Sequence, residues 1–287
     1  MKTKICLITG GNSGIGKQAA IQLAKAGYHV IIGVRNVKKG QVALDEIKEK
    51  STTTNVDLLE INMSSRQSIF DAAQELKKRL EKLDVLIHNA ADFDIARKKL
   101  VKSADGVETI WATNHIGPVL LTTSVMDLIK KSEQGRIITI ASQGLLMHPK
   151  LKVDLEDPEF EKRKFNVPDA YYQSKLAQVM YTYWLAEQLK ETDITVNCIR
   201  VTNVKVDTGR YPDISQFMKF LYSIKSRFSI SPEDMAKTYI YLATSPELAK
   251  ISGKYFNEKN KIVDSSLYST AKENIKAVME LTLKYIE

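Results

Sequence analysis

The sequence has few of the features that mark secreted, metal-binding or membrane-spanning proteins. It contains two cysteines in 287 residues, Cys6 and Cys198, each inside an apolar run, which argues against a disulfide framework and a paired-cysteine metal site. No apolar run approaches the ~18 residues of a membrane span, and the run near the start is too short for a signal peptide. We therefore expect a cytoplasmic protein with buried thiols and no membrane span.

Glycine and proline are also scarce, at 13 and 7 residues, so long stretches can form regular structure. Hydrophobic residues make up 44% and charged residues 26%, which excludes collagen-like and disordered classes. The net charge is +8, but the basic residues are scattered and no aromatic–basic motif accompanies them. We expect a solvated lysine-rich surface and no nucleic-acid partner. The four histidines lack metal-ligand spacing, so we expect no metal.

Short apolar runs alternate along the chain with longer stretches whose apolar residues recur at helical spacing. The runs are continuous, which is typical of strands in a parallel sheet covered on both faces. About seven such runs predict a doubly wound α/β fold, with the whole chain, 1–287, as one domain. Two segments, 146–168 and 202–229, do not follow this alternation of strands and helices, and we expect them to be substrate-side loops. An apolar patch at 217–224 is compatible with a lid or with a packed helix, and residues 264–287 should form a helical extension.

The first predicted strand ends in a cluster of glycines. Its sequence, TGGNSGIG, has the spacing G-x-x-x-G-x-G, follows a strand and begins a helix, as a dinucleotide-binding turn must. Glycine lets the backbone turn sharply and approach a pyrophosphate closely, and the helix N-terminus offers free N–H groups to the anion. We expect the dinucleotide to be bound here by Gly10, Asn12, Ser13, Gly14, Ile15 and Gly16.

The residues after the second predicted strand indicate which nicotinamide cofactor is preferred. An NAD site usually carries an acid about 20 residues beyond the glycine turn, to bind the ribose 2′-hydroxyl. The sequence instead has Val34, Arg35 and Asn36, with three lysines close by. Because a guanidinium suits a 2′-phosphate, we predict NADP(H) in preference to NAD(H), with Arg35 and Asn36 among the cofactor-binding residues. The alternative is that Arg35 only faces solvent.

A tyrosine and a lysine share one face of the long helix predicted over 169–189. Tyr171 and Lys175 are at i and i+4, and an ammonium beside a phenol favours the phenolate and lowers the tyrosine pKa. Such a tyrosine can donate a proton to a carbonyl oxygen that receives a hydride. This pair alone is common by chance. However, Ser142 ends another predicted strand and could bind the same oxygen, and Asn114 lies in the preceding helical stretch.

Taken in order, the motifs TGGNSGIG, HNAA and NHIG, the serine and YYQSK resemble the short-chain dehydrogenase/reductase family over about residues 3–260. The stretches GIGKQAA, VRNVKKG and SADGVETIWATNHIGPVLLT are most similar to its retinol dehydrogenase and protochlorophyllide reductase-like branch. The long step from Ser142 to Tyr171 also resembles that branch. The resemblance implies a Rossmann-type fold and a nicotinamide-dependent oxidoreductase.

The resemblance further implies a role for each matching residue. Tyr171 would be the general acid in reduction and the base in oxidation, while Lys175 would lower its pKa and bind the nicotinamide ribose. Ser142 would polarise the substrate carbonyl, and Asn114 would hold a water that relays protons to Lys175. The other implied cofactor contacts are Asn62 near the adenine, Asn89 and Ala90 on the adenosine side, and Val204 at the carboxamide.

Two departures from the family pattern concern the cofactor end of the site. The family's NNAG reads His88-Asn89-Ala90-Ala91, and its Pro-Gly after the sixth strand reads Val201-Thr202. The second change should alter the turn beside the nicotinamide.

The sequence therefore predicts an NADP(H)-dependent oxidoreductase that transfers hydride between nicotinamide and a carbonyl or alcohol substrate, with an apolar substrate implied by the resemblance. The alternative is a catalytically weak NADP(H)-binding sensor, in which the altered turn prevents turnover. A homodimer or homotetramer is a further expectation, because helices like the one over 169–189 often pack between subunits in this family.

Overall fold

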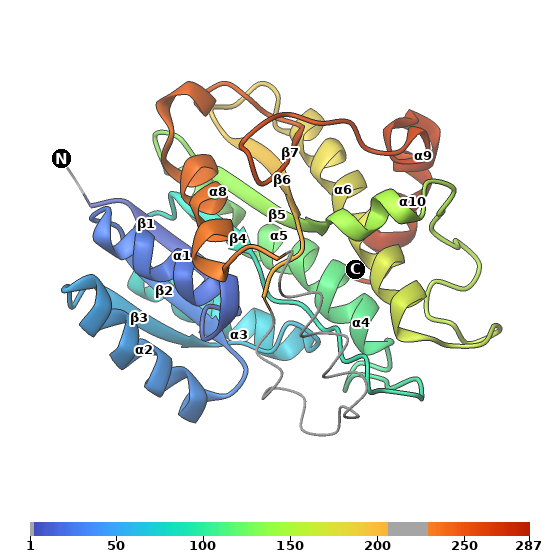
Figure 1. Ribbon diagram of the computed structural model, residues 1–287, viewed down its shortest axis with the longest axis horizontal. Coiled ribbons are helices and arrows are strands. Elements are labelled where there is room, and N and C mark those ends of the chain that lie inside the picture. Colours follow the sequence, from blue (N-terminus) through green and yellow to red (C-terminus); the bar gives the residue numbers. More distant parts are fainter. Residues whose placement is uncertain (1–2, 206–228) are drawn as a thin grey trace.

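The computed structural model describes residues 3–205 and 229–287, and it contains a seven-stranded parallel sheet with helices on both faces (Figure 1). The strand order is β3-β2-β1-β4-β5-β6-β7. This arrangement confirms the doubly wound α/β class predicted from the sequence. The strands are β1 (Ile5–Thr9), β2 (His29–Val34), β3 (Val56–Glu60), β4 (Val85–His88), β5 (Arg136–Ser142), β6 (Thr195–Val201) and β7 (Lys254–Phe256).

The helices connect successive strands, and several begin at a capping side chain. Asn36, Asn166 and Ser231 each accept a hydrogen bond from the backbone N–H three residues on, at 2.9 Å in each case. The helices are α1 (Gly14–Lys25), α2 (Val37–Ser51), α3 (Arg66–Arg79), α4 (Thr109–Trp111), α5 (Gly117–Lys130), α6 (Val167–Gln188), α8 (Pro232–Thr244), α9 (Leu267–Thr270) and α10 (Lys272–Lys284), with short turns η1 (Ala112–Ile116), η2 (Gln143–Met147) and η4 (Pro246–Leu248).

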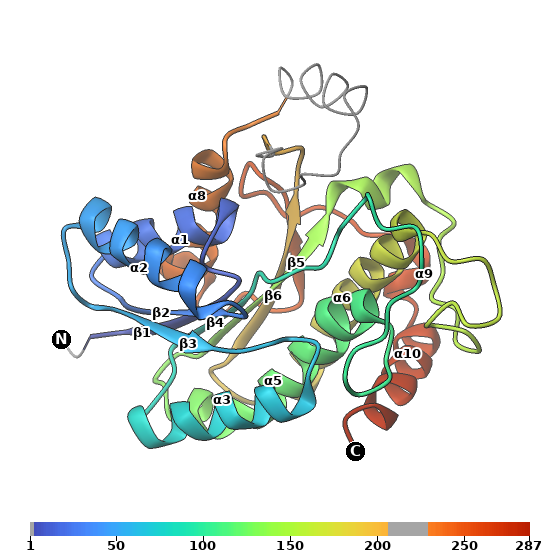
Figure 2. The ribbon, with the colours of Figure 1, turned by 90° about the horizontal axis from the view of Figure 1, so that it is seen from below.

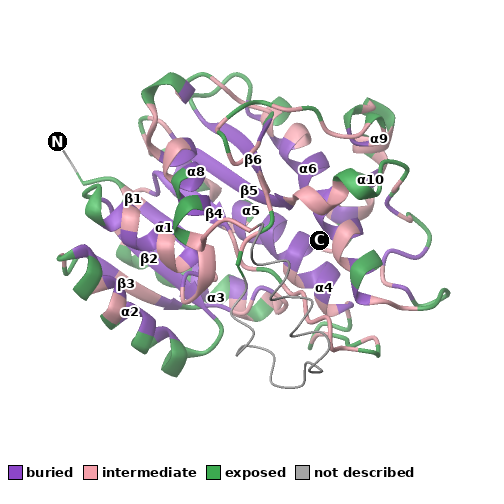
Figure 3. Cartoon of the chain, in the orientation of Figure 1, coloured by how far each residue is buried: buried purple, intermediate pink, exposed green. Residues whose placement is uncertain are grey.

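Alternate side chains of each central strand pack into two separate hydrophobic cores, one on each face of the sheet. In β1, Cys6 and Ile8 pack with α1, α2 and α8, whereas Leu7 packs with α3, α5, α6 and α10 on the opposite face. Figure 2 shows these two helical layers on either side of the sheet. Because both faces are covered, the central strands are buried along almost their whole length (Figure 3), which explains their continuous apolar sequences.

The sequence pattern predicts one interrupted helix over 106–131, before β5. The structure divides this stretch into three elements. The short helix α4 leads into the π-helical turn η1, and α5 follows with Pro118 in its first turn. Proline has no N–H, so the Asn114 carbonyl has no donor four residues on. The regular series of α-helical backbone hydrogen bonds is therefore interrupted at Asn114.

The expected C-terminal helix and loops are only partly regular. The C-terminal helix is two helices, α9 and α10, separated by Ala271. The 146–168 loop begins in η2 and runs without strand or helix to α6. Most of the 202–229 loop, including the apolar patch at 217–224, lies outside the described residues. Within the described part of the chain, no helix has the length and apolar character to cross a membrane.

Candidate active site

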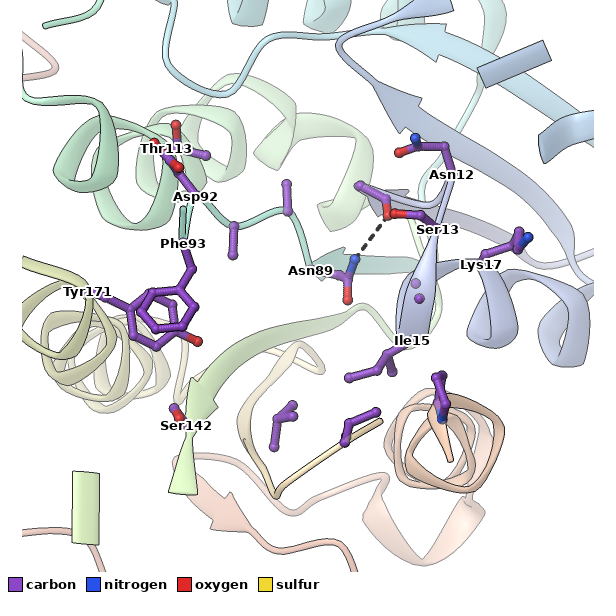
Figure 4. Close-up of a pocket in the computed structure, with 18 of the residues that line it drawn as sticks. Asn12, Ser13, Ile15, Lys17, Asn89, Asp92, Phe93, Thr113, Ser142 and Tyr171 are labelled. Carbon is purple, nitrogen blue, oxygen red and sulfur yellow. Dashed lines mark hydrogen bonds between the residues drawn. The ribbon is translucent and has the colours of Figure 1, made fainter. Parts of the chain in front are cut away.

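A cavity of about 970 Å³ opens at the carboxyl ends of β1, β2, β4, β5 and β6 (Figure 4). It straddles the junction between β1 and β4, where the strand order reverses, which is the usual ligand position in such sheets. Most residues predicted from the sequence line it, namely Gly10, Asn12, Ser13, Gly14, Ile15, Gly16, Arg35, Asn62, Asn89, Ala90, Ser142, Tyr171 and Val204. The predicted residues that do not line it are Asn36, Asn114 and Lys175.

The glycine turn is held in shape by the side chain of Asn89, which follows β4. The Asn89 amide donates hydrogen bonds to the carbonyls of Thr9 (3.0 Å) and Gly10 (3.2 Å), and it accepts one from the Tyr239 hydroxyl (3.1 Å). A Cβ added at Gly16 would lie 2.4 Å from Asn89 Nδ2, so glycine is required there by close packing. Asn89 therefore shapes the turn, and its donors are committed to the protein.

The first turn of α1 offers its backbone N–H groups to the cavity. Ser13 is the N-cap residue, but its side chain makes no capping hydrogen bond, and Gly14, Ile15 and Gly16 all line the cavity. Gly10 and Gly14 adopt positive φ angles of +66° and +55°, which bring the backbone round into the helix. An uncapped helix N-terminus of this kind fits an anionic group such as a pyrophosphate.

At the end of the cavity next to β2, the neighbouring residues Arg35 and Asn36 have different surroundings. Arg35 is exposed and lines the cavity, whereas the Asn36 side chain caps α2 by accepting from Lys39 N at 2.9 Å. The cap therefore engages the oxygen of Asn36, and its amide donors make no hydrogen bond with another described residue. Lys17 lines the cavity too, but its ammonium is paired with Glu46 at 2.6 Å. The Arg35 guanidinium makes no ion pair with another described residue.

The three other predicted cofactor contacts lie along the cavity wall. Asn62 Oδ1 accepts hydrogen bonds from the backbone N–H and the hydroxyl of Ser64, at 3.2 and 2.9 Å. Since its oxygen is engaged, Asn62 presents its amide donors, which suit a ring nitrogen of the adenine. Ala90 N donates to Thr9 Oγ1 at 3.0 Å, and Val204 forms a bridge with Ile230.

Ser142, Tyr171 and Lys175 come together where β5 meets the start of α6. The Ser142 hydroxyl accepts a hydrogen bond from Gly144 N at 3.1 Å, which leaves its proton free to donate. Lys175 is 2% exposed, its Nζ donates to the Ile140 carbonyl at 2.9 Å, and it lies 5.6 Å from the centre of the Tyr171 ring. Burial lowers the pKa of Lys175 to about 8. A cation that can titrate near neutral pH thus lies beneath the tyrosine.

Asn114 lies in η1 and is buried behind the cavity wall. Its amide accepts from Asp92 N at 2.7 Å and donates to the Asp92 carbonyl at 3.0 Å and to Ser174 Oγ at 3.1 Å. The side chain therefore holds the segment after β4 against α6. The Asn114 backbone carbonyl also lacks the donor of a regular α-helix, because Pro118 has no N–H.

The cavity also contains residues that the sequence reasoning missed. The Phe93 ring packs on Tyr171 with ring centres 4.2 Å apart, and Tyr172 packs edge-on to Tyr171 at 5.4 Å. Figure 4 shows Phe93 against Tyr171, at the opposite end of the site from Ser13 and Lys17. Gln143 lines the same region and is hydrogen-bonded to Thr202, which the sequence marks only as a departure from the family pattern. These residues could have been found from their positions in the sequence, because each closely follows the end of a strand or lies beside a predicted site residue.

Comparison with known proteins decides the family. A family model described as short chain dehydrogenase matches residues 4–152. Human retinol dehydrogenase 13 is 34% identical over 257 residues, covering 88% of this chain and 76% of that protein. The chain belongs to the short-chain dehydrogenase family. Its predicted resemblance to the retinol dehydrogenases within that family is confirmed.

Solved structures agree with the fold of this short-chain dehydrogenase. A crystal structure of an uncharacterized protein from Mycobacterium paratuberculosis covers 99% of the chain and 93% of its own, with a TM-score of 0.75 at 22% identity. A short chain dehydrogenase from Escherichia coli CFT073 complexed with NADPH covers 89% of the chain and 96% of its own, with a TM-score of 0.68 at 20% identity. The family is one of oxidoreductases that use a nicotinamide cofactor.

Proposed function

We propose that this short-chain dehydrogenase is an NADP(H)-dependent enzyme that interconverts a carbonyl compound and its alcohol. The observation that carries the proposal is a single cavity with an uncapped helix N-terminus and Arg35 at one end, and Ser142 and Tyr171 at the other. The cavity is large enough for a dinucleotide and a small substrate together.

The residues of the cavity fit the cofactor by charge and by space. The first turn of α1 would hold the pyrophosphate, because its N–H groups are uncapped and its residues line the cavity. Arg35 would hold the 2′-phosphate through charge-assisted hydrogen bonds. Lys17 also lines this part of the cavity, but its ion pair with Glu46 partly neutralises its positive charge. When bound, the nicotinamide supplies or accepts the hydride.

The protein's own groups handle the proton and the carbonyl oxygen. In reduction Tyr171 gives its phenolic proton to the substrate oxygen, and Ser142 donates a second hydrogen bond to that oxygen. The Lys175 ammonium stabilises the phenolate that Tyr171 leaves behind. In oxidation the same groups act in reverse, with Tyr171 as the base. A water on the Asn114 carbonyl would return the proton from solvent.

An apolar substrate is supported by the wall around Tyr171. Phe93 and Tyr172 present rings to this end of the cavity, and Phe93 covers one face of Tyr171. Such rings favour an apolar body next to the reacting carbonyl. The human relative is named a retinol dehydrogenase, and alcohols of that apolar kind belong in the first substrate screen.

The cofactor assignment is tested by calorimetric titration with NADPH and NADH. Wild-type protein should bind NADPH more tightly, and Arg35→Leu should lower NADPH affinity by roughly 10- to 100-fold, the worth of a charge-assisted contact. NADH affinity should change little in the same variant. Equal affinity of the wild type for both cofactors would overturn the NADP(H) assignment.

The chemical assignment is tested by Tyr171→Phe, with Tyr183→Phe as the matched control. Tyr183 lies on the same helix and its hydroxyl pairs with Ser265 at 2.8 Å. Tyr171→Phe should abolish NADPH-dependent carbonyl reduction while NADPH still binds, and Tyr183→Phe should retain turnover. NADPH binding by wild-type protein without turnover of any carbonyl or alcohol would favour the sensor instead.

A further inference from the structure

The ends of β5 and β6 carry a pair of polar side chains that the proposed chemistry does not use. The two strands pair in parallel as far as Ser142 and Val201, so Gln143 and Thr202 are the next residues along each. The Thr202 hydroxyl donates a hydrogen bond to Gln143 Oε1, and both residues line the cavity. The pair therefore lies just past the last paired residues of β5 and β6, next to the predicted catalytic serine.

This hydrogen bond fixes which end of the Gln143 amide is available. Oε1 is engaged by Thr202, and Nε2 has no hydrogen-bond partner among residues 3–205 and 229–287. The base of the side chain is also held in place. Ser142 is paired in the sheet on one side, and Gly144 N is bonded to Ser142 Oγ on the other. The chain thus presents an oriented amide donor whose bond to Thr202 limits its rotation.

The packing over Gly144 adds to this restraint. A Cβ at Gly144 would lie 2.3 Å from a ring carbon of Tyr172, so the Tyr172 ring rests on the backbone just after Gln143. Tyr172 is held in turn by the His148 ring, with centres 4.6 Å apart. The segment from Ser142 to Gly144 therefore has little room to shift when a ligand enters.

We propose that Gln143 is a specificity-determining residue, which binds a second oxygen of the substrate, and that Thr202 is its positioning residue. This inference rests on the proposed carbonyl chemistry. Ser142 and Tyr171 serve the reacting oxygen, so the neighbouring amide donor serves an acceptor on the adjacent carbon or the next one. The substrate class is an apolar carbonyl compound with such an oxygen, as in α-diketones, α-hydroxyketones and β-keto esters.

The test compares two ketones that differ in this oxygen, 2,3-heptanedione and 2-heptanone. The diketone is intrinsically more reactive, so the informative quantity is the ratio of their kcat/KM values in each variant relative to the wild type. Gln143→Leu should lower this ratio by about five- to tenfold, the worth of one hydrogen bond. Gln143→Glu still accepts from Thr202 but offers no donor, and it should lower the ratio at least as much.

Variants of Thr202 separate positioning from contact. Thr202→Val keeps the shape and removes the hydroxyl, so the ratio should fall by about two- to threefold as the amide loses its orientation. Thr202→Ser retains a hydroxyl and should restore most of the wild-type ratio. Thermal unfolding of each variant checks that it is folded.

Two results would overturn the inference. One is a ratio that Gln143→Leu and Gln143→Glu leave unchanged. The other is a change in NADPH affinity with no change in the ratio, which would assign the amide to the cofactor. Failure of the wild type to reduce either ketone would instead count against the proposed function. In that case the dissociation constants of the two ketones, measured with NADPH in Tyr171→Phe with and without Gln143→Leu, test the amide separately, and an unchanged ratio of constants overturns it.

Discussion

Exchanging Asn89 for aspartate should loosen the glycine turn without changing the size of the side chain. In the native structure Nδ2 donates to two carbonyls, those of Thr9 at 3.0 Å and Gly10 at 3.2 Å. Aspartate would point an acceptor at both carbonyls while keeping an acceptor for the Tyr239 hydroxyl. Each lost hydrogen bond costs about 1 kcal/mol, and the opposed oxygens add to this, so the free energy of unfolding should fall by about 2–4 kcal/mol.

The same change should weaken cofactor binding, because the turn facing the pyrophosphate loses its brace. We expect NADPH affinity to fall by about tenfold or more. Urea unfolding at pH 8, where the new carboxyl is ionised, measures the stability, and calorimetric titration measures the affinity. Tyr239→Phe is the matched control, since it removes only the contact at 3.1 Å and should cost about 1 kcal/mol. If Asn89→Asp unfolds at the wild-type urea concentration and binds NADPH as tightly, the bracing role is refuted.

Three further predictions concern titration and packing. Burial lowers the pKa of His88 and of His115 to about 3, against about 6.5 when unfolded, so the unfolded chain takes up more protons as the pH falls below 6.5. The free energy of unfolding should therefore drop by roughly 1.4 kcal/mol per pH unit for each histidine, and equal urea midpoints at pH 7 and 5.5 would contradict this. Because burial lowers the pKa of Lys175 to about 8, kcat/KM for carbonyl reduction should decline as the pH rises above 8 if the step needs the ammonium; a profile level to pH 9.5 would contradict this prediction. Gly144→Ala should displace Tyr172 and raise KM for the carbonyl substrate several-fold, and an unchanged KM would show that the ring does not shape the substrate end.

Local patterns in the sequence predict the sheet well, for a physical reason. A parallel strand covered on both faces is apolar along its buried length, so runs such as residues 30–34 are visible without knowledge of their neighbours. The glycine turn is visible for a similar reason, because it depends on backbone conformations within a few residues. Its sequence predicts both the turn and the helix that follows.

Contacts between distant parts of the chain could not be predicted in this way. Asn89 lies 150 residues from Tyr239 in the sequence, and their hydrogen bond commits the amide to the protein. The same applies to Thr202, which the sequence marks only as a departure from a family pattern. Its bond to Gln143 depends on the register of two strands that are far apart in the chain. Asn36 shows the opposite case, because its capping bond is local and joins residues three apart in the sequence.

The order of strands also has a consequence for how the chain assembles. The sheet consists of a first half, β3-β2-β1, and a second half, β4-β5-β6-β7, and within the sheet only the β1–β4 pairing joins them. That pairing brings Cys6 beside Val85, so it closes a long chain loop and carries a larger loop-closure entropy cost than the β1–β2 pairing. The cavity straddles this joint, with the α1 N-terminus on one side and Ser142 on the other. A ligand that spans the cavity therefore fastens the two halves together, and occupancy should protect the joint from opening and proteolysis.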